Sequence, residues 1–175
     1  MMKKIIAAIA AASLLVCLLA GCSLGSKKES KELHQVQLSA GSYVTFDAKT
    51  VNQDGYEITA KDGSWRMTIH ECYSAEELAS YKEFFEKNVE MNAANNVITE
   101  KKQLGEYSYD TATYTANEQN FGEYFTGFPS PVDCGGGTQL YGYSISTWMK
   151  HNDGDTRDAV ESIISSLTST PKTGK

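Results

Sequence analysis

The chain has 175 residues, of which 16 are Lys or Arg and 22 are Asp or Glu, so its formal charge is −6 at pH 7. This acidic balance argues against nucleic-acid binding, which needs clustered basic side chains to neutralise phosphates. It argues equally against attachment to anionic lipid through a polybasic surface. The length suits one domain with an ordinary hydrophobic core.

The first 22 residues have the pattern of an export signal. Lys3 and Lys4 precede an apolar run, residues 5–19, that only Ser13 interrupts. Two small residues follow, and then Cys22. The apolar run is too short for a membrane span and lacks a stop-transfer flank. A plain secretory signal would end in small residues and would need no thiol at position 22.

The segment Leu19-Ala20-Gly21-Cys22 resembles the lipobox of bacterial lipoproteins. The resemblance implies that Cys22 receives a diacylglycerol and that the bond before it is cleaved. Residues 1–21 are then a signal peptide. Without Lys3 and Lys4 the remaining chain has 14 basic and 22 acidic side chains, a formal charge of −8. Because two acyl chains give stable attachment, we expect a lipid-anchored, extracytoplasmic protein of the cell membrane, with the choice of inner or outer membrane left open.

Residues 22–34 are predicted to be the lipidated Cys and a flexible tether, because residues 23–32 are small, polar or charged and have no apolar period. A single domain is predicted over residues 35–170, and a disordered tail over 171–175. The domain opens with strand patterns near residues 35–38 and 43–46. A hairpin follows, in which Tyr56, Ile58 and Ala60 should share an apolar face and Asp62-Gly63 should form the turn.

The period then changes to that of a helix. Ser74 and Glu77 have the spacing of a capping box, and apolar residues fall on one face of residues 75–91. Residues 97–103, 106–116, 123–127 and 140–149 are predicted as strands, with irregular loops at 129–131 and 135–137. A last helix, with Asp155 as its N-cap and Asp158 in the reciprocal position, should pack its apolar face and end before Pro171.

This order predicts an α+β fold in which an antiparallel β-sheet is covered by two main helices. It resembles the PsbP-like α/β sandwich, which also occurs in small bacterial surface lipoproteins. The resemblance implies binding and accessory roles, and it carries no shared catalytic residues. The segments that carry it are Gly41-Ser42-Tyr43-Val44, Gly55-Tyr56-Glu57-Ile58, Ser74-Ala75-Glu76-Glu77, Leu104-Gly105-Glu106-Tyr107 and Ile163-Ile164-Ser165-Ser166-Leu167.

Cysteine usage leaves two thiols in the predicted domain, Cys72 and Cys134. Outside the cytoplasm such a pair often forms a disulfide. The sequence does not show whether the two Cα atoms come close enough, so a bridge and two separate buried thiols both stay open.

Three motifs contain reactive residue types, and each has a structural interpretation that fits its spacing better. His70-Glu71-Cys72 lies on a predicted strand, so His70 and Cys72 should share a face while Glu71 points away. The acidic run of Asp153, Asp155, Asp158 and Glu161 does not fit an EF-hand calcium loop and is typical of a helix cap and first turn. Residues 135–137, three glycines, lack the residues of a phosphate loop. No metal or cofactor is predicted.

An aromatic group is the remaining binding candidate. Tyr124, Phe125 and Phe128 precede a Pro/Gly loop and are predicted to form a platform for a sugar ring or a peptide, with sheet packing as the alternative. We therefore expect a non-catalytic binding or accessory domain of the cell envelope, with a protein, peptide or glycan partner. The alternative is an envelope hydrolase or thiol enzyme that uses Cys72 or Cys134.

Overall fold

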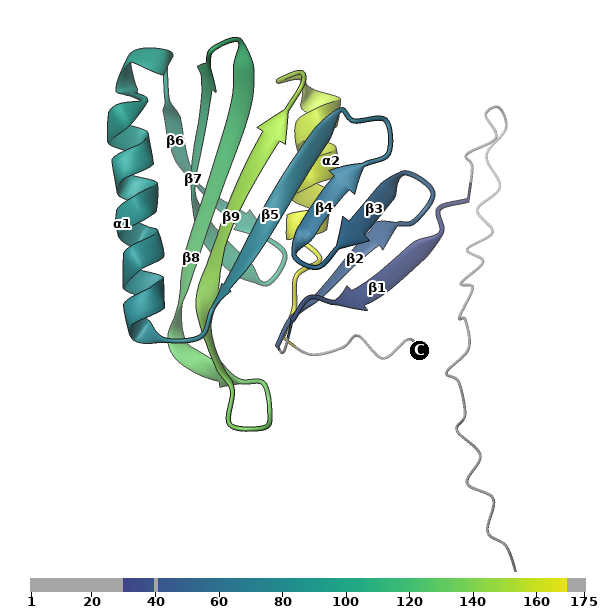
Figure 1. Ribbon diagram of the computed structural model, residues 1–175, viewed down its shortest axis with the longest axis vertical. Helices are drawn as coiled ribbons and strands as arrows, with labels where there is room; N and C mark the ends of the chain where they lie inside the picture. The colour runs from purple at the N-terminus through teal and green to yellow at the C-terminus, as the bar shows by residue number, and fades with distance from the viewer. Residues whose placement is uncertain (1–29, 40, 170–175) are drawn as a thin grey trace, which may run out of the picture. The chain divides into compact units, whose positions relative to one another are not determined.

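The computed structural model describes residues 30–39 and 41–169 of the chain (Figure 1). The predicted signal peptide, Cys22, residues 23–29 of the predicted tether and the predicted tail all lie outside the described residues. The described residues belong to one unit, Ser30–Pro171, with a shared set of internal contacts.

The described residues form nine strands, two α-helices and one short 3₁₀ helix. In chain order these are β1 (Leu33–Gln37), β2 (Tyr43–Asp47), β3 (Val51–Asp54), β4 (Glu57–Ala60), β5 (Trp65–Cys72), α1 (Ala75–Met91), η1 (Ala93–Asn95), β6 (Ile98–Leu104), β7 (Tyr107–Ala116), β8 (Gln119–Asp133), β9 (Gln139–Met149) and α2 (Gly154–Ile164).

Seven strands form one antiparallel sheet in the order β3-β4-β5-β9-β8-β7-β6. Strands β1 and β2 form a separate antiparallel hairpin. Most neighbours in the large sheet follow one another in the chain. The exception is β5, which pairs with β9 although α1 and three strands lie between them in the chain. The predicted α+β class with an antiparallel sheet and two helices is confirmed.

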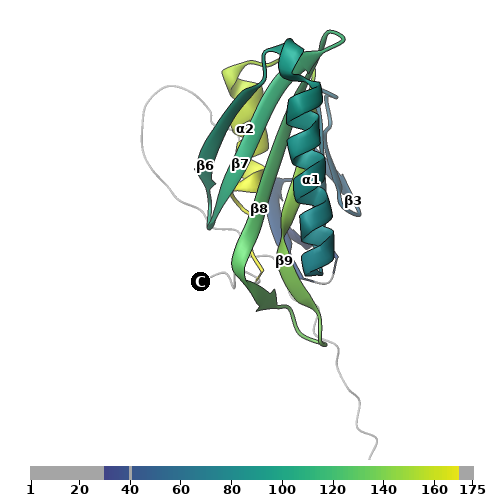
Figure 2. The ribbon, with the colours of Figure 1, turned by 90° about the vertical axis from the view of Figure 1, so that its left-hand side faces the viewer.

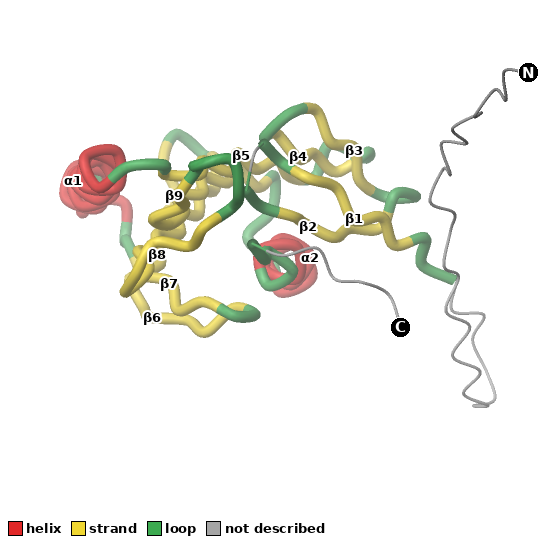
Figure 3. The backbone as a smooth tube through the Cα atoms, turned by 90° about the horizontal axis from the view of Figure 1, so that it is seen from below, coloured by secondary structure: helices red, strands yellow, loops and turns green. Residues whose placement is uncertain are grey.

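The two helices cover opposite faces of the large sheet (Figures 2 and 3). Helix α1 packs against β5, β8 and β9, whereas α2 packs against β2, β5 and β6. The main hydrophobic core lies on the α2 side, where β1 and β2 add to the cover. Helix α1 has no fully buried residue, so its cover of the other face is partial.

Strand β5 shows why the sheet has one strongly apolar face. Trp65, Met67 and Ile69 are 4%, 1% and 1% exposed, and their alternation places all three in the core on the α2 side. The predicted turn is present, and Ile58 pairs across it with Met67. Tyr56 departs from the prediction: it precedes β4 rather than lying in it and is 60% exposed.

The capping signal of α1 is confirmed with one change. Ser74 Oγ accepts the N–H of Glu77 at 3.0 Å. The carboxylate of Glu77 accepts the N–H of Tyr73 at 2.7 Å, one residue before the expected donor. Both bonds satisfy backbone donors at the helix start, which fixes the point where the chain leaves the sheet.

The N-cap predicted for α2 is wrong by two residues. Asp153, not Asp155, accepts the N–H of Thr156 at 2.8 Å, and the helix begins at Gly154. Either Asp could serve as a cap by residue type, and the extended backbone at Asp153 decides between them. Asp155 is therefore a first-turn residue whose side chain is not used by the cap.

The predicted tether boundary at residue 34 also needs correction. Strand β1 begins at Leu33, and the N–H of Glu32 donates to Asp47 Oδ1 at 3.1 Å. Lys49 Nζ donates to the carbonyl oxygen of Ser30 at 2.7 Å. Residues 30–34 are therefore bonded to the domain, because β2 offers an unpaired edge on which polar residues form a ladder as readily as apolar ones.

Strand β8 is longer than predicted and includes the segment 129–131 that was expected to be an irregular loop. Its pairing with β9 shifts register between Gly127 and Val132, which accommodates the prolines in a bulge. The turn at residues 135–137 is confirmed, since all three glycines have positive φ. Gly105, in the β6–β7 turn, has φ +61°, and a Cβ there would collide with the carbonyl oxygen of Ser165 after α2.

Candidate functional site

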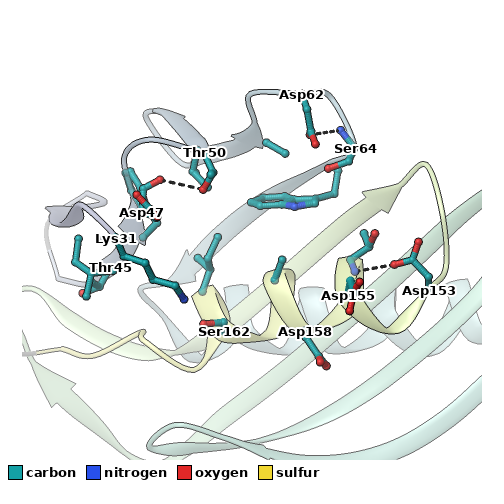
Figure 4. A pocket seen from close by; sticks show the side chains of 18 residues that line it. Lys31, Thr45, Asp47, Thr50, Asp62, Ser64, Asp153, Asp155, Asp158 and Ser162 are labelled. Carbon is teal, nitrogen blue, oxygen red and sulfur yellow. Dashed lines mark hydrogen bonds between the residues drawn. The ribbon is translucent and has the colours of Figure 1, made fainter. Parts of the chain in front are cut away.

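A groove of about 800 Å³ runs between α2 and the strands at the β1–β4 end of the domain (Figure 4). We call it the acidic groove. Its walls come from segments that are far apart in the sequence. The residues that line it are Lys31, Leu33, Thr45, Phe46, Asp47, Thr50, Val51, Ala60, Asp62, Ser64, Trp65, Asp153, Asp155, Thr156, Asp158, Ala159, Ser162 and Ile163.

The floor of the acidic groove is apolar. Phe46, Val51 and Trp65 are 7%, 7% and 4% exposed, so each presents only an edge of a core side chain. On the helix side the lining residues Ala159 and Ser162 are small and exposed, which leaves the groove open above this floor.

Carboxylates line both sides of the groove. On the strand side Asp47 Oδ1 accepts the N–H groups of Glu32 and Lys49, at 3.1 and 3.0 Å. Asp62 Oδ1 accepts the N–H of Ser64 at 2.9 Å, and hydrogen bonds from Ser64 hold the pKa of Asp62 below its ordinary value.

On the helix side the hydrogen bonds that Thr156 donates likewise lower the pKa of Asp153. Asp155 and Asp158 are exposed, and no ion pair within the described part of the chain involves either. Lys31 is the one cationic side chain among the described lining residues. The lining therefore has a net negative charge at neutral pH, which Lys49, Lys150 and Arg157 offset in part from nearby.

A second, smaller cavity of about 300 Å³ lies on the opposite face, between α1 and the sheet. Ser80, Tyr81 and Phe84 contribute to it from α1, and His70, Ser144 and Ser146 from β5 and β9. The His70 ring stacks on Tyr81 with centroids 5.1 Å apart. Burial lowers the pKa of His70, although the Glu77 carboxylate acts in the opposite direction, so this cavity has no strong charge at neutral pH.

The two cysteines of the domain are free thiols in the structure. Cys72 is buried beneath α1, where burial and the Glu77 carboxylate raise its pKa to about 12. Cys134 lies on the other face of the sheet, its Sγ 3.6 Å from the carbonyl oxygen of Gly41. Burial, Glu71 and Asp133 raise the pKa of Cys134 as well. Of the two alternatives left open by the sequence, the structure has separate thiols.

The prediction for His70-Glu71-Cys72 is confirmed in its geometry. His70 and Cys72 face α1, while Glu71 points to the opposite face and is 8% exposed. Glu71 Oε2 accepts hydrogen bonds from the Ser39 backbone N–H at 3.1 Å and from the Tyr73 hydroxyl at 2.7 Å. His70, Glu71 and Cys72 therefore cannot converge on one reacting atom.

The predicted aromatic platform is wrong in its placement. Tyr124 and Phe125 are 1% and 5% exposed and lie in the middle of β8, because that strand continues through the expected loop. Tyr124 packs on the α2 side and Phe125 packs against α1. Phe128 is partly buried and stacks on Tyr107 with centroids 4.8 Å apart. The sheet-packing alternative therefore accounts for all three.

The described residues contain no group of three or more His, Cys, Asp or Glu side chains placed to hold a metal ion. Glu161, the last residue of the acidic run, does not line the groove. Its carboxylate forms an ion pair with Lys102 at 2.7 Å. Within 30–39 and 41–169, no helix has the length and apolar character to span a membrane.

The chain is similar in structure to a protein of Bacteroides thetaiotaomicron, at 10% sequence identity and a TM-score of 0.34. The match covers 80% of this chain and 42% of that chain, so this chain spans less than half of the other's length. No protein-family profile matches the chain, and no curated protein matches it in sequence.

Sequence reasoning identified none of the groove as a site. The sequence did single out Asp153, Asp155 and Asp158, but the acidic run was interpreted as a helix cap and first turn rather than as a calcium site. Trp65 and Phe46 were interpreted as strand residues, and Lys31 as part of the tether. No local signal joins these residues, because the groove exists only where β2, β3, β5 and α2 meet.

Proposed function

We propose that the protein is a lipid-anchored, extracytoplasmic lipoprotein of the cell membrane, and that its domain binds a ligand without catalysis. The acidic groove is the observation that carries the binding role. Its volume falls in the range of ligand sites, and it combines an apolar floor with a few polar groups around it. Leu19-Ala20-Gly21-Cys22 is the feature that supports the anchor.

Two features favour a binding domain over a thiol enzyme. Nucleophilic thiols need a lowered pKa, and the pKa values of Cys72 and Cys134 are both raised, so each thiol is protonated at neutral pH. His70, which shares a face with Cys72, has a lowered pKa and stacks against a tyrosine. Neither thiol has the partner set that nucleophilic catalysis uses.

We also propose a PsbP-like sandwich as the finer description of the fold. The features in its favour are the antiparallel sheet, the helices on its two faces and the hairpin of β1 and β2 before the large sheet. A binding or accessory role in the envelope, with a protein, peptide or glycan partner, is what that resemblance implies.

The anchor is tested with Cys22→Ala. The substitution should leave an unlipidated precursor that still contains the signal peptide and fails to incorporate a labelled fatty acid. Mass spectrometry of the purified protein gives the N-terminus and the acyl mass. A mature N-terminus elsewhere, without an acyl group, would contradict the anchor.

The binding role is tested by placing a photo-crosslinking amino acid at position 162 in the groove and, as a matched control, at position 79 on α1. Ser162 and Ala79 are both exposed helix residues on opposite faces of the sheet, so neither replacement should disturb folding. We expect a discrete adduct in cells from position 162 alone. Equal adducts from both positions, or none from 162, would argue against the groove as a binding site.

A further inference from the structure

We propose that the acidic groove binds a short basic peptide segment, one that carries spaced Lys or Arg side chains and at least one apolar side chain. This inference rests on the proposed binding role and names the class of ligand for the same groove. It follows from three properties of the lining: the sign of its charge, the way that charge is spread, and the apolar floor beneath it.

The sign of the charge selects a cation. Five aspartates and one lysine line the groove. Hydrogen bonds within the strand turn and the helix cap keep Asp62 and Asp153 ionised. Asp155 and Asp158 have no ion-pair partner among the described residues. Lys49, Lys150 and Arg157 lie near enough to act on three of the aspartates, so they offset part of this charge. An anionic ligand would still meet net repulsion from the lining, whereas ammonium or guanidinium groups meet complementary carboxylates.

The spread of the charge selects an extended ligand over a metal ion. Figure 4 shows Asp47 beside Lys31 at one end of the groove, and Asp62, Asp153 and Asp155 at the other. Metal sites need carboxylates that converge on one point, and no three such groups converge among the described residues. Carboxylates that are spaced along a groove instead match cationic side chains that are spaced along a peptide.

The apolar floor distinguishes a peptide from a simple polyamine. Phe46 and Trp65 are almost fully buried residues of the groove lining, and the small Ala159 lines the helix side. A ligand that only carried amines would leave these surfaces in contact with water. An apolar side chain that covers them adds about 25 cal/mol for each Å² removed from water.

The second cavity, on the opposite face of the sheet, provides an internal contrast. The lining between α1 and the sheet contains His70 and serine hydroxyls but no carboxylate. A cation therefore has a reason to choose the acidic groove, and binding that survives its alteration must come from elsewhere on the protein.

The experiment titrates the full lipidated protein, in neutral detergent, with four probes by calorimetry. The first is an end-blocked Lys-Leu-Lys-Leu-Lys peptide. The second replaces each Lys by Glu, the third replaces each Leu by Ser, and the fourth is spermidine. We expect the first probe to bind, the second not to bind, and the third and fourth to bind more weakly. Added salt should weaken the first probe.

Two pairs of variants locate the site. Asp155→Asn with Asp158→Asn should weaken binding of the Lys-Leu probe about tenfold, because two exposed ion pairs with the peptide are lost. Glu76→Gln with Glu90→Gln removes the same charge from exposed positions on α1 and should leave the affinity unchanged.

A steric pair completes the test. Ala159→Trp should abolish binding by filling the groove, and its control, Ala79→Trp, should not. Equal affinity for the Glu peptide, equal weakening by the control pair, or no binding of the Lys-Leu probe would each overturn the proposed ligand class. Spermidine binding as tightly as the Lys-Leu probe would also overturn it. A crosslinked adduct from position 162 would survive these results, so failure of the ligand class is distinguishable from failure of the binding role.

Discussion

Removal of the hydroxyl oxygen from each of two buried tyrosines should change the free energy of unfolding with opposite signs. Tyr109 and Tyr143 are both 0% exposed. The Tyr143 hydroxyl is 2.8 Å from Ser42 Oγ, which is itself fully buried. The Tyr109 hydroxyl has no hydrogen-bond partner among the described residues. The substitutions Tyr109→Phe and Tyr143→Phe remove one oxygen each, yet only the second breaks a hydrogen bond.

The magnitudes follow from the cost of burying polar groups. An unpaired buried hydroxyl costs about 1–3 kcal/mol, which Tyr109→Phe regains in part. The space that the oxygen vacates, on the order of 10 Å³, costs only about 0.2 kcal/mol at roughly 24 cal/mol per Å³. We expect Tyr109→Phe to stabilise the protein by about 1 kcal/mol. Tyr143→Phe loses a hydrogen bond and leaves Ser42 unpaired, so it should destabilise by about 1–3 kcal/mol.

Urea unfolding of a chain that begins after Cys22 measures both effects. At an m value of about 2 kcal/mol/M, a change of 1 kcal/mol moves the midpoint by about 0.5 M. The two variants should move it in opposite directions with unchanged m. If Tyr109→Phe lowers the midpoint by as much as Tyr143→Phe, the Tyr109 hydroxyl has a partner, and the reasoning from its isolation is refuted.

Three further substitutions or modifications have defined outcomes. Gly105→Ala should destabilise by more than the 1–2 kcal/mol of a left-handed backbone alone, because its Cβ meets the chain after α2; Gly55→Ala, at φ +58° with nothing within 4 Å, should show only the backbone cost in the same urea assay. Burial raises the pKa of Glu123 above 4.5, so the folded state holds this proton more tightly than the unfolded state does. The free energy of unfolding should therefore fall as pH rises from 4.5 through the folded pKa, and Glu123→Gln should remove that fall. If the variant has the same dependence of stability on pH as the original protein, Glu123 is not the group responsible. Native alkylation should modify the partly exposed Cys134 before the buried Cys72, and detection of no thiol even after unfolding would indicate a bridge instead.

Much of the architecture was predictable because its signals are local. The Ser74 cap and the apolar face that follows gave α1 its observed limits, residues 75–91. The Asp62-Gly63 turn and the alternation beyond it predicted the β4–β5 hairpin, and the same alternation placed His70 and Cys72 opposite Glu71. Each of these depends on residues within a few positions of one another, so the sequence alone contains the cause.

The sequence predictions were wrong where contacts between distant segments decide whether a residue is buried or paired. Tyr124 and Phe125 look like loop-side aromatics, but β9 extends β8 past the prolines and buries both of them. The first two residues of β1, Leu33 and His34, look like tether until β2 supplies their partners. Asp155 becomes a groove residue only because α2 lies across from β2 and β3. The sequence by itself therefore determined α1, the β4–β5 hairpin and the alternation of faces along β5. Tertiary structure decided burial and the groove, because both depend on which faces meet after long stretches of intervening chain.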